Sequence, residues 1–285
     1  MRRITGLFIY PFKSLQGIRV SEVAFTPRGF ADDRIFMLVD EQGRMVTLRE
    51  YPRLATIRVA VPAGDSFNYA VGRPDVGRIL IPRVELDPRT HQAQTVIIHD
   101  QESVMLRVGK QEDEFFSACL KQSVRLVRAS KSHPRIRKIG EDTQLALNAQ
   151  DAYPVTILSE ASLRDLNKRL SAMRVNPVTL DRFRPNIYMD GDDTPHAEDR
   201  LAPIIFGEDT VFNRVKLCSR CRAVTVHVDS GSKRFGQFDM NNEPLKTLVS
   251  YRQVYREGKD PHAYFAVNAV PERSGRLNVG MQVTE

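Results

Sequence analysis

Two cysteines in a basic stretch are the residues of this sequence best suited to chemistry. Cys218 and Cys221 stand three positions apart, and Lys216, Arg220 and Arg222 flank them. Neighbouring cations favour the thiolate form of cysteine, which is the form that ligates metals. Their spacing admits a zinc site, a redox disulfide, one activated thiolate, or two ordinary cysteines beside a strand.

The rest of the sequence narrows these interpretations. Zinc needs more ligands, yet there is no second CxxC pair and the six histidines show no paired ligand spacing. A thioredoxin-type disulfide lies at a strand-to-helix turn, whereas β-prone residues 224–228 follow this pair. An activated thiolate and two ordinary cysteines both stay open. Three cysteines are too few for a disulfide framework, and we expect Cys119 to be a buried core thiol.

The elements that must position these cysteines are mainly β-strands. Short apolar alternations between Gly and Pro turn residues fill the first hundred or so residues and predict a small barrel or sandwich. The strands predicted there run over 4–10, 20–25, 34–39, 44–48, 56–61, 78–81 and 95–98. Further strands are predicted at 155–158, 187–189, 204–206 and 211–217, and in the tail at 264–283 with turns at Gly275 and Gly280.

Two helices and one charged loop interrupt the strands. Apolar residues at helical spacing predict a helix over 112–121. A second, amphipathic helix is predicted to begin at Ser159, which is a capping residue type, and to continue through Leu170. The basic stretch 130–140 has no apolar period and is predicted to be a loop, either a solvated connector or an anion-binding segment. The fold class predicted is mostly β with some α.

Length and charge exclude several classes of protein. The 285 residues have ordinary globular composition, which excludes collagenous, disordered and mini-protein chains. No apolar run approaches the roughly 18 to 20 residues of a membrane span, and no signal peptide is visible, so we expect a cytoplasmic protein. The net charge of 42 − 35 = +7 suits nucleic acid, acidic lipid or a phosphorylated small molecule equally well.

Several separated motifs resemble one known family. The segments 216–221, 183–186 and 243–252 resemble the MOSC domain of the molybdenum cofactor sulfurase C-terminal superfamily. The segments 10–14, 33–34 and 45–54 look like that family's N-terminal β-barrel domain. The motifs are similar to those of the mitochondrial amidoxime reducing component and of bacterial 6-N-hydroxylaminopurine resistance proteins. The resemblance implies an N-terminal β-barrel domain over 1–118, a connecting segment over 119–145, and a β-barrel MOSC domain with peripheral helices over 146–285.

The resemblance also implies a molybdenum cofactor and its site. Cys221 matches the family's molybdenum ligand, and a soft thiolate suits this metal alongside the pterin dithiolene. Cys218 would then be a neighbour of the site. The positions that match the family's cofactor contacts are Lys13, Ser14, Arg34, Arg184, Asn186, Ser219, Arg220 and Tyr264. The cations among them would meet the phosphate of the pterin.

The activity implied is reduction of N-hydroxylated compounds, a form of detoxification. Amidoximes, hydroxylamines or N-hydroxylated bases would be reduced to amidine or amine and water, with the cofactor carrying the chemistry. Where relatives carry Asp or Ser, this chain has His227, which could donate a proton to the departing water. The chain ends at Glu285 without the cysteine cluster of an iron–sulfur domain, so we expect a separate electron donor, a reductase or a ferredoxin-type protein.

Other functions are also compatible with the sequence. The same fold could serve as a molybdenum cofactor carrier or a sulfur-handling protein without reductase activity. A nucleic-acid-binding module would use the basic stretch Lys131 to Lys138, but no interleaved aromatic residues accompany it, so nucleic acid and membrane are not expected partners. A disulfide reductase would depend on Cys218 and Cys221 alone.

Overall fold

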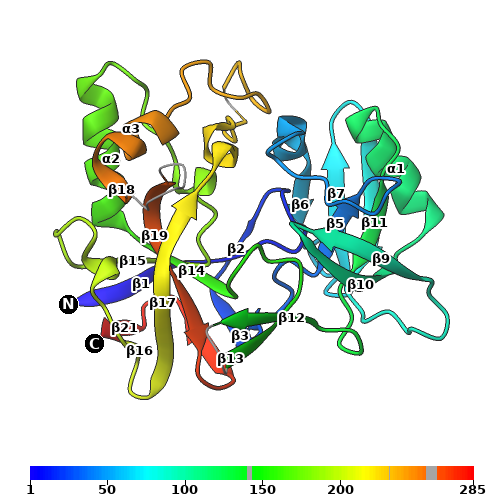
Figure 1. The fold of residues 1–285 in the computed structure, drawn as a ribbon, viewed down its shortest axis with the longest axis horizontal. Helices are drawn as coiled ribbons and strands as arrows, with labels where there is room; N and C mark the ends of the chain where they lie inside the picture. The colour runs from blue at the N-terminus through cyan, green and yellow to red at the C-terminus, as the bar shows by residue number, and fades with distance from the viewer. Residues whose placement is uncertain (140–142, 231, 255–261) are drawn as a thin grey trace. The chain divides into compact units, whose positions relative to one another are not determined.

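One β-sheet of the protein closes on itself. In the computed structural model, which describes residues 1–139, 143–230, 232–254 and 262–285, strand β14 pairs with both β15 and β19 (Figure 1). The path β14-β15-β1-β21-β16-β17-β19 therefore returns to its start as a seven-stranded barrel. Its strands are β1 (Arg2–Ile9), β14 (Val155–Ser159), β15 (Ile187–Asp190), β16 (Ile204–Phe206), β17 (Thr210–Arg220), β19 (His262–Pro271) and β21 (Gln282–Thr284). In this ring β14 and β15 run parallel and the other six neighbouring pairs run antiparallel. Strands β2 (Ile18–Val20) and β18 (Gln253–Val254) extend the sheet.

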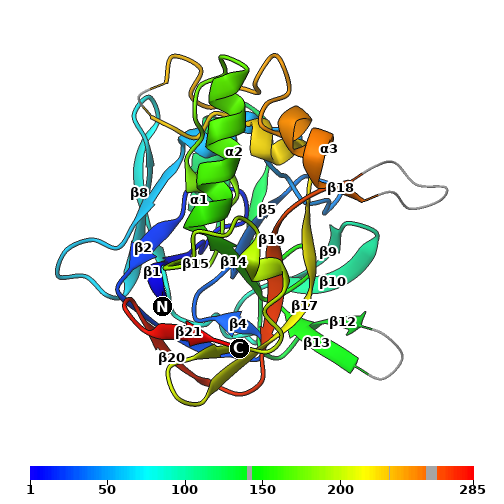
Figure 2. The same cartoon turned by 90° about the vertical axis from the view of Figure 1, so that its left-hand side faces the viewer.

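Two helices cover an apolar cluster of this barrel. Helix α2 (Glu160–Ala172) begins as predicted, since the Ser159 hydroxyl accepts a hydrogen bond from the Ser162 amide. Helix α3 (Leu245–Arg252), which sequence patterns did not predict, lies beside α2 (Figure 2). Leu166, Leu170, Leu248 and Phe265 are fully buried in the cluster between them and the sheet. Short 3-10 turns complete this part: η2 (Leu180–Arg182), η3 (Ala197–Asp199) and η4 (Arg222–Thr225).

Contacts divide the chain into two units that alternate along the sequence. The barrel unit comprises 1–9, 19–31 and 153–285, and it also contains the sheet of β20 (Gly275–Asn278), β3 (Glu22–Thr26) and β4 (Gly29–Phe30). The second unit comprises 10–18 and 32–152. The first and last strands of the chain are neighbours in the barrel, because Arg2 pairs with Val283.

The second unit is also mainly β. A four-stranded sheet joins β5 (Phe36–Val39), β11 (Arg125–Arg128), β10 (Gln101–Arg107) and β9 (Ala93–Ile98). A three-stranded sheet joins β6 (Arg58–Ala60), β7 (Asn68–Arg73) and β8 (Gly77–Pro82), with η1 (Pro52–Thr56) before it. Helix α1 (Lys110–Leu120) confirms the predicted helix, and Cys119 on it is fully buried, as expected. The predicted strand at 44–48 was wrong, since only isolated bridges form there.

The basic stretch at 130–140 is only partly the predicted loop: residues 130–134 form a turn, whereas residues 135–139 form a strand of a hairpin. Strand β12 (Arg135–Ile139) pairs antiparallel with β13 (Thr143–Leu147), and residues 140–142 of the predicted connecting segment lie outside the described residues. The Arg135 side chain is buried and donates to the carbonyls of Asn148 and Gln150. The composition of the stretch favoured a loop because the carbonyls that accept hydrogen bonds from Arg135 belong to residues outside 130–140.

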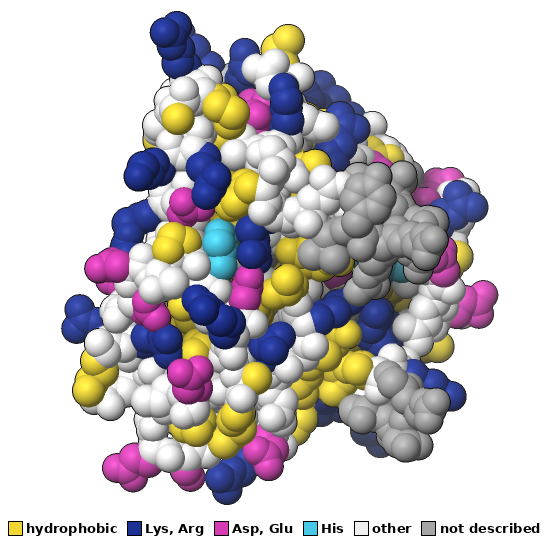
Figure 3. Space-filling view, turned by 60° about the vertical axis from the view of Figure 1, so that its left-hand side comes forward, with side chains coloured by type: hydrophobic (Ala, Val, Ile, Leu, Met, Phe, Trp, Pro, Cys, Tyr) yellow, Lys and Arg dark blue, Asp and Glu magenta, His cyan; other side chains and the backbone are white. Residues whose placement is uncertain are grey.

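The fold class predicted from the sequence, mostly β with some α, is confirmed. Among the described residues, no helix combines the length and apolar character that crossing a membrane would require. On the face shown in Figure 3, Lys and Arg side chains are scattered among acidic and hydrophobic ones. The excess of seven positive charges therefore does not form a single patch on this face.

Candidate functional site

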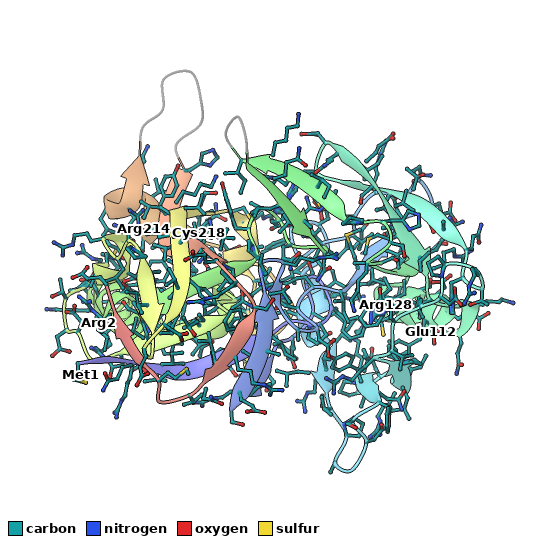
Figure 4. All side chains as sticks on the ribbon, turned by 90° about the horizontal axis from the view of Figure 1, so that it is seen from below. Met1, Arg2, Glu112, Arg128, Arg214 and Cys218 are labelled. Atoms are coloured by element: carbon teal, nitrogen blue, oxygen red, sulfur yellow. The ribbon has the colours of Figure 1, made fainter. Side chains whose placement is uncertain are left out.

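Strand β17 carries the cysteine pair to the end of the barrel sheet. It pairs with β19 from Phe212 to Arg220, and Figure 4 labels Arg214 and Cys218 on it. Between Leu217 and Ser219 the register shifts, with the extra residue on β19. Ala266 lies at this bulge with a left-handed φ of 73°. A β-bulge changes the direction of the side chains around it. The last residues of β17 therefore pair with β19 in a register different from that of the rest of the strand.

Cys221 and Cys218 occupy different surroundings. Cys221 follows the last residue of β17 and starts the 3-10 turn η4, where the sequence suggested a strand. Its thiol is half-buried, and its carbonyl accepts from the Val224 amide. Cys218 packs against the apolar cluster under α2 and α3. None of the three cysteines forms a disulfide, and no group of three His, Cys, Asp or Glu side chains within the described ranges is arranged to hold a metal ion.

Arg220 is a partly buried cation next to Cys221. Its Nε donates to the carbonyl of Phe265 at 2.7 Å, and its Nη1 donates to the carbonyl of Phe183 at 2.9 Å. The third nitrogen, Nη2, is buried and has no hydrogen-bond partner among the described residues. An unpaired buried N–H of a cation is costly, so an anionic ligand fits this place beside the thiol.

The segment that carries Arg184 is joined to this strand by Arg220. Arg184 follows η2 with a left-handed φ of 53°. Next to it, burial raises the pKa of Asp181, and the charge of Arg184 opposes that rise. Because Arg220 bonds the carbonyls of the residues adjacent to Arg184 and to Tyr264, it brings these three predicted site segments together.

Asn186, Tyr264 and Ser219 hold different places in the barrel. Asn186 is buried, and its carboxamide accepts from the Thr156 amide and donates to the Phe8 carbonyl, both at 3.2 Å. This side chain thus fastens β14 and β1 to the start of β15. Tyr264 is buried opposite Ser219 in the β17–β19 ladder, while Ser219 is exposed.

His227 lies in a polar group that sequence reasoning missed. Its Nδ1 is 2.8 Å from an Arg182 nitrogen, and its Nε2 is 3.3 Å from an Asp239 carboxylate oxygen. Burial and the Arg182 charge hold the pKa of His227 below its ordinary value, although Asp239 raises it. Arg182 precedes the Phe-Arg-Pro-Asn motif directly, which is the one sequence signal that could have drawn attention to it.

In the second unit, Lys13 is a buried ammonium with partners of its own. It donates to the carbonyl of Ala149 at 2.8 Å and pairs with the carboxylate of Asp151. Burial lowers the pKa of Lys13, and Asp151 opposes this. Although burial raises it, Lys13, His99 and Arg49 hold the pKa of Asp151 well below its usual range. The sequence did not single out Asp151 as the partner of Lys13.

Ser14 and Arg34 share an unusual backbone conformation. Their φ angles are 72° and 50°, in the left-handed region that only a few per cent of non-glycine residues occupy. The Ser14 hydroxyl accepts from the Leu48 amide, and Arg34 pairs with buried Asp33 at 2.6 Å while lying over the Tyr10 ring. Arg184 in the barrel unit shows this conformation too, as do seven other described non-glycine residues, so by itself it does not mark the site.

Comparisons with known proteins match the chain in two consecutive regions. Residues 1–123 match the family described as the MOSC N-terminal beta barrel domain, and residues 144–284 match the MOSC domain. Human mitochondrial amidoxime-reducing component 1 is 33% identical over 292 residues, covering 97% of this chain and 81% of that protein. Human mitochondrial amidoxime reducing component 2 is 29% identical over 296 residues, with 97% and 81% covered.

A plant protein shares the same regions. The molybdenum cofactor sulfurase of Oryza sativa subsp. japonica is 30% identical over 270 residues, which cover 90% of this chain and 31% of the sulfurase. Both family regions follow one another in the expected order and together span nearly the whole sequence. The chain therefore belongs to the MOSC-domain family, with a MOSC N-terminal beta barrel domain ahead of its MOSC domain.

Proposed function

We propose that this protein binds a molybdenum–molybdopterin cofactor and reduces N-hydroxylated small molecules. The observation that carries the cofactor proposal is the half-buried Cys221 thiol next to Arg220, whose buried Nη2 has no partner in the described structure. A thiolate supplies a soft ligand and a cation supplies a counter-charge for an anionic pterin. The substrate class follows from the similarity to amidoxime-reducing components over 97% of the chain.

Each residue of the site has a distinct task in this proposal. Cys221 ligates the metal, and Arg220 and Arg184 neutralise anionic groups of the cofactor. Tyr264 and exposed Ser219 line the same end of the β17–β19 ladder. Asn186 secures the strands behind them, in keeping with its bonds to Thr156 and Phe8. The proposal extends to Lys13, Ser14 and Arg34 through their motif positions alone.

The bound cofactor would supply a two-electron reduction that removes oxygen from nitrogen. The overall reaction consumes an N-hydroxy group, two electrons and two protons and yields the amine or amidine and water. A separate reductase or ferredoxin-type protein provides the electrons. Such a reaction detoxifies N-hydroxylated compounds. For His227, which the sequence predicted as the proton donor, the contacts with Arg182 and Asp239 favour a positioning role instead.

The similarity to a sulfurase supports one second candidate. The chain matches 31% of the rice molybdenum cofactor sulfurase at 30% identity. A cofactor carrier or a sulfur-handling protein would use the same cysteine and cations without reducing a substrate. The two candidates share the cofactor and differ in turnover.

We also propose a cellular location and domain bounds for this protein. We place the protein in the cytoplasm, and the absence of disulfides among its three cysteines suits a reducing compartment. Along the sequence we propose an N-terminal region 1–118, a connecting segment 119–145 and a MOSC region 146–285.

The test compares the two cysteines. Cys221→Ser is expected to abolish molybdenum binding and benzamidoxime reduction with an artificial electron donor, because a neutral hydroxyl replaces the soft thiolate ligand. Cys218→Ser is the matched control from the same strand end, and it should retain both. Molybdenum is measured by elemental analysis of protein purified from a cofactor-competent host.

Three outcomes separate the candidates. Loss of metal and activity in the Cys221 variant alone supports the reductase. Metal in the wild-type protein without turnover of any N-hydroxylated substrate supports the carrier. Full metal content in Cys221→Ser would overturn the assignment of the ligand.

A further inference from the structure

The His227 ring lies between a cation and a carboxylate within the barrel unit. On one side, an Arg182 Nη2 is 2.8 Å from Nδ1. On the other, an Asp239 carboxylate oxygen is 3.3 Å from Nε2. The Arg234 charge also acts on the ring. The imidazole is 16% exposed, and the Asp239 side chain is 14% exposed, so water reaches this contact poorly.

The chemistry of arginine determines the protonation of the ring. A guanidinium has only donors, so Nδ1 must accept the hydrogen bond from Arg182 and cannot carry a proton. The remaining proton of a neutral imidazole then lies on Nε2, which is 3.3 Å from the Asp239 carboxylate but makes no hydrogen bond within the described residues. Nδ1 is thus committed to Arg182, and Nε2 is buried beside the negative charge of Asp239.

The same residues fix the turn that begins at Cys221. The carbonyl of Thr225, the last residue of η4, accepts from the Asp239 amide at 2.8 Å and from Arg182 Nη1 at 3.2 Å. The Thr225 hydroxyl donates to the carbonyl of Arg222. One Arg182 side chain therefore holds both the end of η4 and the His227 ring.

A second arginine, Arg220, connects the same two segments in the opposite direction. Arg220, on β17, donates to the carbonyl of Phe183, which follows η2, while Arg182, in η2, donates to the end of η4. These two arginines connect the segment that carries Arg184 with the turn that carries Cys221, because each donates a hydrogen bond across to the other side. Loss of either one would free one end of the turn.

We propose that Arg182, neutral His227 and Asp239 are positioning residues that hold the Cys221 turn against the Arg184 segment, and that His227 is not the proton donor of the reaction. The positioning role rests on the proposed function, whereas the protonation state of His227 does not depend on it. In that state Nδ1 carries no proton and Nε2 carries one.

The first experiment needs no cofactor. Nitrogen-15 spectra of the cofactor-free protein at pH 7 are expected to show His227 Nδ1 as unprotonated and Nε2 as protonated, with the signals assigned by their loss in His227→Asn. Arg182→Met should raise the pKa of His227 because a neighbouring positive charge is removed. Arg164→Met, which removes an exposed arginine elsewhere in the barrel unit, should leave these signals unchanged. An imidazolium or a proton on Nδ1 would overturn the proposal.

The second experiment separates positioning from proton transfer in the loaded protein. Arg182→Met is expected to lower molybdenum retention or kcat by about 10- to 100-fold, the range for groups that support a metal ligand. His227→Asn retains an acceptor for Arg182 and should recover most of the activity lost in His227→Ala. Equal losses in both His227 variants, together with loss of one limb of the pH–rate profile, would make His227 the acid and overturn the positioning role.

The failure of one proposal is distinguishable from the failure of the other. If Cys221→Ser keeps its metal, the proposed ligand is wrong, while the tautomer of His227 is unaffected. If the tautomer is wrong and Cys221→Ser still loses metal, only the positioning inference falls. Thermal unfolding of each variant shows whether a loss of activity reflects a loss of fold.

Discussion

Two buried tyrosine hydroxyls in this chain have opposite hydrogen-bonding states. Tyr69 donates to an Asp32 carboxylate at 2.8 Å. The Tyr251 hydroxyl is buried with no partner in the described part of the chain, and Arg169 lies 3.9 Å from the centre of its ring. A buried donor without an acceptor costs free energy, whereas a hydrogen bond to a charged group contributes about 1.5 to 3 kcal/mol.

Replacing each tyrosine by phenylalanine should therefore shift stability in different directions. Tyr69→Phe is expected to lower the free energy of unfolding by about 1.5 to 3 kcal/mol. Tyr251→Phe should leave it unchanged or raise it, because the ring and its contact with Arg169 remain while the unpaired hydroxyl is removed. Urea unfolding of the two variants beside the wild type provides the measurement. An equal loss in both would show that Tyr251 has a partner in solution.

At the scale of elements, sequence patterns correctly predicted a helix whose stabilising contacts lie close together in the sequence. The helix that begins at Ser159 was predicted because its cap and its apolar stripe lie within a few residues of one another. The strand β12 was not, because Arg135 is stabilised by carbonyls 13 and 15 residues away. The same limit applies to the site: Cys221 could be recognised by its motif, but Arg182 reaches His227 across 45 positions, which no spacing pattern reveals.

The β12–β13 hairpin offers a direct test at this scale. Burial, helped by Arg137, lowers the pKa of Arg135 to about 10, and the side chain donates to the carbonyls of Asn148 and Gln150. Arg135→Ala leaves these carbonyls without their donor and should cost about 2 to 3 kcal/mol of unfolding free energy. Exposed Lys138 on the same strand is the control, and Lys138→Ala should change stability by less than about 0.5 kcal/mol. Equal effects in denaturant unfolding would show that β12 is a solvated segment after all.

At the scale of the whole molecule, the barrel depends on the first strand of the chain. Strand β1 lies between β15 and β21 (Figure 1). Ile4 and Leu7 on this strand are fully buried. The proposed MOSC region 146–285 lacks this strand. Without β1, the unpaired edges of β15 and β21 and the apolar residues behind them would face water.

A fragment of residues 146–285 is accordingly expected to lack a cooperative unfolding transition. Residues 1–31 joined to it by a Gly/Ser linker restore β1 and the sheet of β3, β4 and β20 and should recover the transition. Circular dichroism during urea unfolding distinguishes the two chains. Cooperative unfolding of the fragment alone would mean that the barrel can close without β1.

The left-handed backbone at Ser14, Arg34 and Arg184 has a consequence for the history of the family. An L-residue in this conformation costs about 1 to 2 kcal/mol, which glycine avoids. Glycine at these positions would relieve the backbone cost, but at Ser14 and Arg34 it would also remove the contacts with Leu48 and with buried Asp33. If these side chains bind the proposed cofactor, a relative without that cofactor is expected to carry glycine most readily at the position of Arg184.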